Sequence, residues 1–129
     1  MQYSLLIQAF EPTEEEIPEE EIPEEAMEPM KVAFDLYAKE LDAAGVLVSA
    51  DILARSDVTT TVTMRGGTLK VHDGPFANTR EQLGGTFVVD VPDLDAAIAW
   101  AQKCPAAQYG SIEIRPSAIT FTGGQWVYA

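Results

Sequence analysis

The residues of this chain that could take part in chemistry gather in one short run, His72 to Gly85. Asp73 stands directly before Gly74-Pro75, where the preceding strand must end because proline fixes φ and lacks an amide donor. In one interpretation Asp73 is a general acid or base in a cleft, since apolar surroundings raise the pKa of a carboxyl group. In the other, its carboxylate caps the backbone amides of the bend. The sequence leaves both interpretations open.

The neighbours of Asp73 supply the other groups expected at a ligand cleft. Phe76 would form an apolar wall, or would instead pack as a plug under the second helix. Arg80 is the nearest cation able to orient an acidic small molecule, and with Glu81 it would otherwise form a weak surface pair. The predicted ligand-binding residues are therefore His72, Gly74, Pro75, Phe76 and Arg80.

Histidine and cysteine usage argues against other kinds of site. His72 is the single histidine, and its strand neighbours place it on a polar face rather than at a catalytic centre. One histidine with scattered carboxylates shows no metal-ligand spacing, so neither a metal nor a cofactor is expected. The single cysteine, Cys104, ends a predicted helix, where the pKa of a thiol is not lowered. We therefore expect a structural role for Cys104.

The elements that must position the run are strands and two amphipathic helices. Apolar residues recur at helical spacing over 27–44, and Gly45 follows where a left-handed C-cap is expected. The second helix begins at Pro92-Asp93, with Asp93 as N-cap, and stops at Cys104-Pro105. Strands are predicted over 3–10, 46–52, 58–64, 68–72, 86–91 and 111–115, with a short hairpin in 119–128. Gly84-Gly85 is expected to release the chain into the strand at Thr86.

The strongest hairpin signal is Gly66-Gly67, which joins the strands 58–64 and 68–72. A two-residue turn gives one apolar face and one polar face. The apolar pairs are Val62 with Val71 and Met64 with Leu69, and the polar pairs are Thr61 with His72 and Thr63 with Lys70. His72 and Asp73 then point to opposite faces of the strand.

The element order predicts one α+β domain over residues 1–129, of ferredoxin-like type, with two helices on one face of a mainly antiparallel sheet. Residues 117–129 form a short C-terminal extension to it. The second sheet face needs a cover, for which Trp100, Trp126, Tyr109 and the threonine-rich hairpin face are available. A homodimer is the expected arrangement.

The net charge of −13 lies mostly in the segment 11–28, where Glu-Glu-Ile-Pro-Glu occurs twice. We interpret this segment as a solvated acidic insert, with an acidic docking segment or a weak cation site as alternatives. No Lys/Arg patch is present for a phosphate backbone, so nucleic-acid binding is not expected. No apolar run is long enough to span a membrane and no signal peptide is evident, which predicts a cytoplasmic protein.

Four blocks of sequence resemble the DGPF-motif branch of the YCII-related proteins. They are His72–Gly85, which holds the Asp-Gly-Pro-Phe motif, and Leu41–Val48, Val89–Trp100 and Gly110–Pro116. The resemblance implies a small bacterial dimeric α+β-barrel protein whose sheets pack face to face beside a cleft. It also implies a mostly unassigned biochemical role. Proteins similar to this branch are often associated with extracytoplasmic-function sigma factors, and the wider superfamily includes isomerase-like and monooxygenase-like enzymes.

Three functions follow from the residues and the resemblance. The first is a small-molecule-binding dimeric domain associated with bacterial regulation. The second is a small-molecule enzyme of isomerase, lyase or hydrolase type that uses Asp73 as general acid or base. The third is a purely structural dimer module. The other branch of the family carries a histidine on the first helix, proposed to pair with an aspartate, and the predicted helix 27–44 has no histidine to take that role.

Overall fold

The computed structural model describes residues 1–11, 24–77 and 79–129. The strands are β1 (Gln2–Phe10), β2 (Leu47–Ile52), β3 (Thr60–Arg65), β4 (Thr68–Asp73), β5 (Glu81–Asp90), β6 (Ser111–Pro116), β7 (Ile119–Thr122) and β8 (Gln125–Tyr128). The helices are α1 (Glu24–Ala43) and α2 (Leu94–Lys103), with two single 3₁₀ turns, η1 (Ser56–Val58) and η2 (Pro105–Gln108). The predicted acidic insert lies for the most part outside the described residues.

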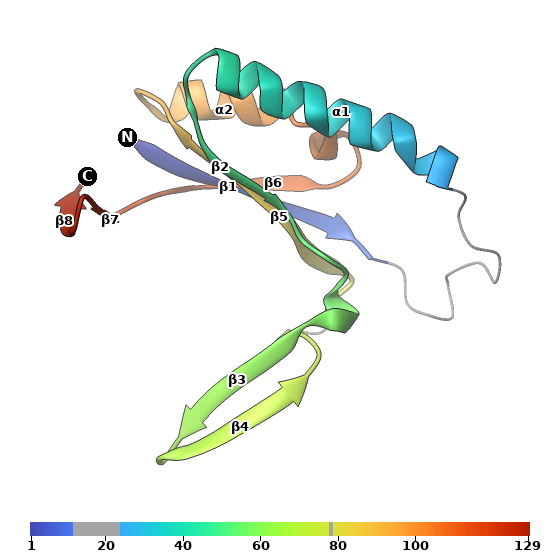
Figure 1. Cartoon of the computed structure of the whole chain (residues 1–129), viewed down its shortest axis with the longest axis vertical. Coiled ribbons are helices and arrows are strands. Elements are labelled where there is room, and N and C mark those ends of the chain that lie inside the picture. Colours follow the sequence, from blue (N-terminus) through green and yellow to red (C-terminus); the bar gives the residue numbers. More distant parts are fainter. Residues whose placement is uncertain (12–23, 78) are drawn as a thin grey trace.

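The four central strands form an antiparallel sheet in the order β2-β5-β1-β6. Both helices cover the same face of this sheet (Figure 1). This arrangement is an α+β fold of ferredoxin-like type, as the element order predicted. None of the helices in the described part is long and apolar enough to cross a membrane.

The core lies between the sheet and the two helices. Its side chains alternate along the central strands, as expected where only one face of a strand is covered. The buried members include Tyr3, Leu5 and Ile7 of β1, Phe87 and Val89 of β5, Tyr37 and Leu41 of α1, and Ala97 and Ala101 of α2. The hydroxyl of Tyr37 donates a hydrogen bond to the backbone oxygen of Trp100 at 2.8 Å, which ties α1 to α2.

Helix α1 begins three residues earlier than predicted and includes Pro29. This proline stands in the second turn, where it removes a backbone hydrogen bond without ending the helix. Tyr37 and Leu41 are buried as predicted, whereas Met30 and Ala44 are exposed. The side chain of Met27 lies outside the described part. Gly45 has φ = 74°, which confirms the left-handed C-cap.

Strand β5 begins at Glu81, so the prediction that Gly84-Gly85 precedes the strand was wrong. The two glycines lie inside β5, where its register with β1 shifts between Ile7 and Gln8. A Cβ atom on Gly85 would lie 2.7 Å from the backbone oxygen of Asp51. The glycine is therefore needed for close strand packing at a bulge, a demand that the turn-forming character of Gly-Gly concealed.

The sheet face opposite the helices is not covered by any element of the described chain (Figure 1). We call this surface the open face. One row across it consists of Asp51, Thr86, Leu6 and Glu113, and the next contains Ser49, Val88, Ser4 and Arg115. The prediction that Trp100 and Tyr109 help to cover this face was wrong. The ring of Trp100 lies under Lys103, which bonds to Glu40 of α1, and the Tyr109 hydroxyl contacts Met30, so both belong to the helix layer.

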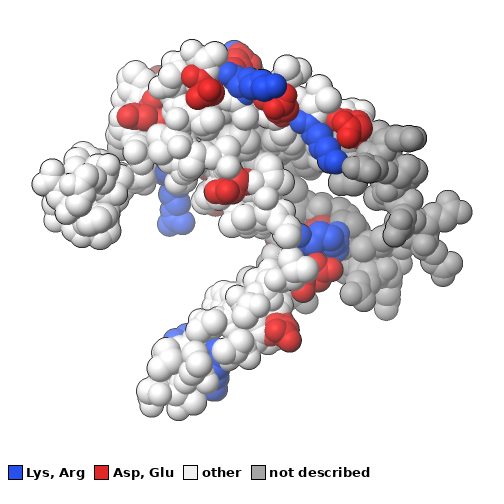
Figure 2. Space-filling model, in the orientation of Figure 1, with Lys and Arg blue, Asp and Glu red and all other residues white. Residues whose placement is uncertain are grey.

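Two hairpins project from the central sheet (Figure 1). Strands β3 and β4 form the hairpin that we call the arm, and their register is the predicted one. Strands β7 and β8 form the predicted terminal hairpin, with Phe121 and Trp126 in edge contact. Figure 2 shows a hollow between the arm and the body of the molecule.

Candidate functional site

A cleft of about 620 Å³ lies at the base of the arm. One wall is the segment 53–59, which connects β2 to the arm. The other consists of residues 75–77 and 79, between the arm and β5. Gln8 and Leu83, paired across β1 and β5, line it from the open face of the sheet. The volume and the mainly apolar lining match small-molecule sites in general.

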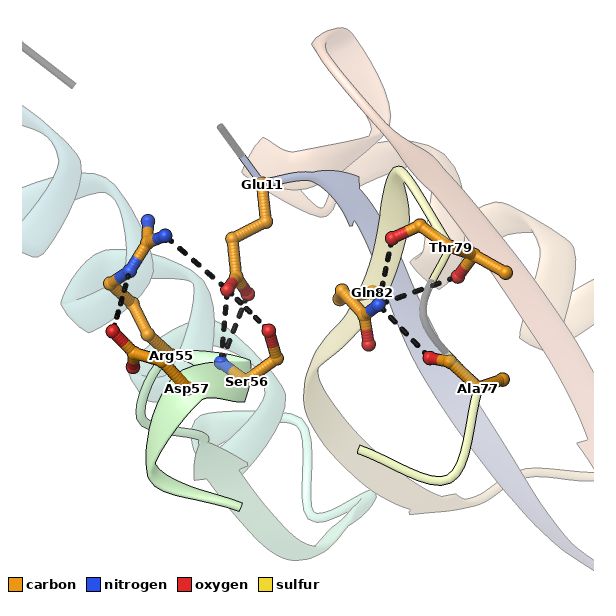
Figure 3. A network of polar contacts seen from close by, with 7 residues as sticks. All are labelled: Glu11, Arg55, Ser56, Asp57, Ala77, Thr79 and Gln82. Atoms are coloured by element: carbon orange, nitrogen blue, oxygen red, sulfur yellow. Dashed lines mark hydrogen bonds and ion pairs between the residues drawn. The ribbon is translucent and has the colours of Figure 1, made fainter. Parts of the chain in front are cut away.

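The first wall is held by Glu11, at the end of β1 (Figure 3). Its carboxylate accepts hydrogen bonds from the backbone amide of Ser56 at 3.0 and 3.1 Å and from the Ser56 hydroxyl at 2.5 Å. The guanidinium of Arg55 lies 3.5 Å from the same carboxylate and 3.8 Å from that of Asp57. Bonds to a charged acceptor are stronger than neutral ones, so this network fixes the 3₁₀ turn against β1.

The second wall is held by Gln82, near the start of β5 (Figure 3). Its amide nitrogen donates to the backbone oxygens of Ala77 at 3.2 Å and Thr79 at 2.7 Å. The Thr79 hydroxyl in turn donates to the backbone oxygen of Glu81 at 2.5 Å. Both walls are thus anchored to the same end of the central sheet, which gives a preformed cleft.

The bend at Gly74 is closed by the arm rather than by Asp73. The amide of Gly74 donates to the backbone oxygen of Thr59 at 2.8 Å, and the Thr61 hydroxyl donates to the oxygen of Gly74 at 2.7 Å. Pro75 has no backbone N–H group that a carboxylate could cap. Gly74 has φ = 115°, a conformation that favours glycine. Of the amides that the capping interpretation assigned to Asp73, the Gly74 amide therefore bonds to Thr59 instead.

The predicted site residues divide into two groups. Pro75 and Phe76 line the cleft, and Phe76 is 84% exposed, so it is not a plug under α2. His72, Asp73, Gly74 and Arg80 lie next to the cleft but outside its lining. His72 is exposed on the polar face of the arm opposite Thr61, and Asp73 is exposed at the end of β4 opposite Thr60. The guanidinium of Arg80 lies 5.1 Å from the centre of the Phe10 ring.

The residues that sequence reasoning missed are Glu11, Ser56 and Gln82. Gln82 belongs to the run His72–Gly85, and its position after a polar turn was a usable signal. Glu11 is one of many glutamates in an acidic stretch, and Ser56 is 45 residues away along the chain. No local pattern links these two residues, because a long-range contact decides their role.

The titratable groups of the core do not supply a nucleophile for the cleft. Burial raises the pKa of the Cys104 thiol above its ordinary value, although backbone hydrogen bonds oppose the shift. Burial also raises the pKa of the Tyr37 phenol. Both groups stay protonated at neutral pH and lie in the helix layer. Among the described residues no three histidine, cysteine, aspartate or glutamate side chains are grouped so as to hold a metal ion.

Comparison with known proteins places the chain in a family. The model of the YCII-related domain matches residues 1–118. An uncharacterized protein of Rhizobium meliloti (strain 1021) is 35% identical over 96 residues, which cover 71% of this chain and 77% of that protein. Residues 1–118, which the family model matches, include the central sheet, both helices, the arm and both walls of the cleft. The chain therefore belongs to the YCII-related domain family.

Proposed function

We propose that this protein binds a small molecule in the cleft between the segment 53–59 and residues 75–77 and 79. The observation that carries this proposal is the anchoring of both walls, by Glu11 on one side and Gln82 on the other. Walls that are fixed before a ligand arrives reduce the entropy lost on binding. A loop held in this way, with an exposed phenylalanine at its tip, is suited to contact a ligand.

The lining favours a mainly apolar molecule with one or two polar groups. Leu53, Val58, Phe76 and Leu83 provide apolar surface, and Ser56, Thr59 and Gln82 provide hydrogen-bonding groups. The cation of the lining is Arg55, whose charge is balanced by Glu11 and Asp57. Arg80 lies at the margin and would orient an acidic group that extends from the cleft.

We favour binding without turnover over the enzymatic alternative. An acid–base mechanism needs the Asp73 carboxylate within hydrogen-bonding reach of a substrate. Asp73 lies at the end of β4, outside the cleft lining, and His72 points to the other face of that strand. His72, Asp73 and Gly74 therefore enter the proposal as residues of the cleft margin. A regulatory association rests on the resemblance to the DGPF branch alone.

We further propose that two copies pair through the open face. Leu6 and Val88 lie half-buried at its centre, among polar side chains that can pair with a second copy. One layer of helices covers only one face of the sheet, and a homodimer would cover the other.

A thermal-shift screen against a metabolite library tests the binding proposal. We expect at least one compound to raise the melting temperature, because a ligand that binds only the folded state stabilises it by mass action. Each hit is then incubated with the protein and followed by mass spectrometry. Recovery of the unchanged compound supports a binder, and conversion that is lost in Asp73→Asn would establish the enzymatic alternative. A screen without any stabilising compound would contradict the proposal.

Light scattering coupled to size-exclusion chromatography tests the pairing. We expect the mass of a dimer at micromolar concentration. A monomer across the concentration range would contradict it.

A further inference from the structure

Strand β6 forms one edge of the central sheet, and within the described residues no strand pairs with its outer side. The amide of Ser117 donates to the backbone oxygen of Gln2 at 2.9 Å, which continues the register of β6 with β1. Backbone groups of an antiparallel strand point to alternate sides, so the odd-numbered residues of β6 bond to β1. The N–H and C=O groups of Ile112 and Ile114 therefore point outwards, where another strand can pair with them.

The charged side chains of β6 alternate in sign on one face of the sheet. Glu113 and Arg115 are exposed on the open face, where their neighbours on β1 are the uncharged Leu6 and Ser4. Neither forms an ion pair within the part of the chain that the structure describes. The other edge strand, β2, has Asp51 as its single charged residue. Strand β6 is therefore the edge whose charges can be matched by a second copy of itself.

One antiparallel register of two β6 strands satisfies both the backbone and the charges. With Ile114 opposite Ile114 of a second copy, the outward backbone groups of the two strands face each other. Glu113 then lies directly opposite Arg115 of the second copy, and symmetry gives this pair twice. A contact centred on Glu113 or on Arg115 would place like charges directly opposite, which is unfavourable. A contact centred on Ile112 would place both charges opposite uncharged residues.

An apolar groove beside β6 favours the same register. Its volume is about 320 Å³, and Ile98 and Ala101 of α2 line it together with Ile112 and Ile114. Both β6 isoleucines pack against the core but are only half-buried, because no further strand lies beside them. In the register centred on Ile114, the isoleucine of the second copy lies beside this groove. It adds apolar contact to the hydrogen bonds and the ion pairs.

We propose that two copies of this chain join edge to edge through β6, in the antiparallel register that is centred on Ile114. The two central sheets then form one continuous sheet, with both helix layers on the same side. The contact uses one strand of each copy, so it buries less than the roughly 800 Å² per partner of a stable interface. We therefore expect it at higher protein concentration than the open-face pairing, where it joins two open-face pairs into a tetramer.

A pair of cysteine variants tests the register directly. Positions 113 and 115 of two copies would form a non-hydrogen-bonded pair, with Cα atoms about 4.5 Å apart, a separation that suits a disulfide. We expect an equimolar mixture of Glu113→Cys and Arg115→Cys to give a disulfide-linked product on mild oxidation, measured by non-reducing electrophoresis. Each variant alone should give less than a tenth of this product, and the buried Cys104 should stay free.

Charge exchange tests the ion pairs. Sedimentation equilibrium of the wild type at sub-millimolar concentration should show the tetramer. Glu113→Arg should weaken its formation at least tenfold, because like charges then lie opposite each other. The double variant Glu113→Arg/Arg115→Glu restores opposite charges across the contact and should recover the wild-type affinity within threefold.

The outcomes separate the edge contact from the open-face pairing. A mixture that gives no more disulfide than the single variants, or a wild type without the larger assembly, would overturn the edge contact. A disulfide in Glu113→Cys alone, or a double variant as weak as Glu113→Arg, would overturn the register. A disulfide found only in the mixture, in a protein that is monomeric at micromolar concentration, would support the edge contact and overturn the open-face pairing alone.

Discussion

At the scale of single residues, Glu11 is the side chain on which the first wall of the cleft depends. Its carboxylate takes three hydrogen bonds from Ser56 and an ion pair from Arg55. We expect Glu11→Ala to lower the free energy of unfolding by about 1–2 kcal/mol, because it leaves the Ser56 amide without its acceptor. Urea denaturation measures this change.

Glu28→Ala is the matched control for Glu11→Ala. Glu28 is 58% exposed on α1, and its carboxylate lies 4.0 Å from Lys31. A surface pair of this kind contributes little, so the change should stay within about 0.5 kcal/mol. Equal effects of the two substitutions would contradict the role of Glu11.

The buried thiol and phenol predict a loss of stability at alkaline pH. Burial raises the pKa of Cys104 above 9.0 and that of Tyr37 above 10.0. As the pH rises past each ordinary value, the unfolded chain loses a proton that the folded protein keeps. The free energy of unfolding is therefore highest below pH 9 and falls as the pH rises towards the raised values. Urea titrations at intervals from pH 7 to 10.5 should show this decline.

Cys104→Ala separates the thiol from the phenol in this decline. In the variant, the free energy of unfolding should no longer fall between pH 9 and 10, but it should still fall above pH 10. Parallel profiles of the variant and the wild type would show that the thiol is not its origin.

At the scale of elements, the two glycines of β5 have different roles although they are neighbours. A Cβ atom on Gly85 would meet the backbone of Asp51 at 2.7 Å, whereas one on Gly84 would meet Ile7 at an ordinary 3.8 Å. We expect Gly85→Ala to cost about 1–3 kcal/mol, because strand β2 must move to admit the methyl group. Gly84→Ala should be neutral or slightly stabilising. Thermal unfolding of both variants compares them, and a similar loss in both would contradict this account of the bulge.

The elements that could be predicted from the sequence are those with a local signal. The Gly66-Gly67 turn set the register of the arm, Asp93 capped α2, and apolar periodicity placed the core of α1. The start of β5 was misplaced because Glu81 and Gln82 look like loop residues, and only pairing with β1 makes them a strand. Trp100 was misassigned because its place depends on how α2 packs beside α1. Pairing and packing are long-range properties that local patterns do not carry.

The candidate site was predicted only in part for the same reason. The run His72–Gly85 led to one wall of the cleft, and Pro75 and Phe76 line it. The opposite wall, 53–59, and its anchor Glu11 come from other parts of the chain. Nothing in the composition of these segments distinguishes them from ordinary polar loops.

At the scale of the whole molecule, the fold places the open face, the arm and the cleft next to one another. The open face and the cleft meet where β1 ends and β5 begins, since Gln8 and Leu83 belong to both. Figure 1 shows that the arm joins the body near this end of the sheet. A second copy on the open face would therefore lie beside the cleft. The most direct test of the account nevertheless concerns the cleft itself.

The decisive measurement is the affinity of the strongest compound from the screen for Phe76→Ala and for Tyr128→Ala. Both residues are exposed aromatics, 84% and 79% respectively, but only Phe76 lines the cleft. Isothermal titration calorimetry should show at least a tenfold higher Kd for Phe76→Ala, at an unchanged melting temperature of the free protein. Tyr128→Ala should bind as the wild type does. Equal affinity of Phe76→Ala and the wild type would contradict the assignment of the cleft.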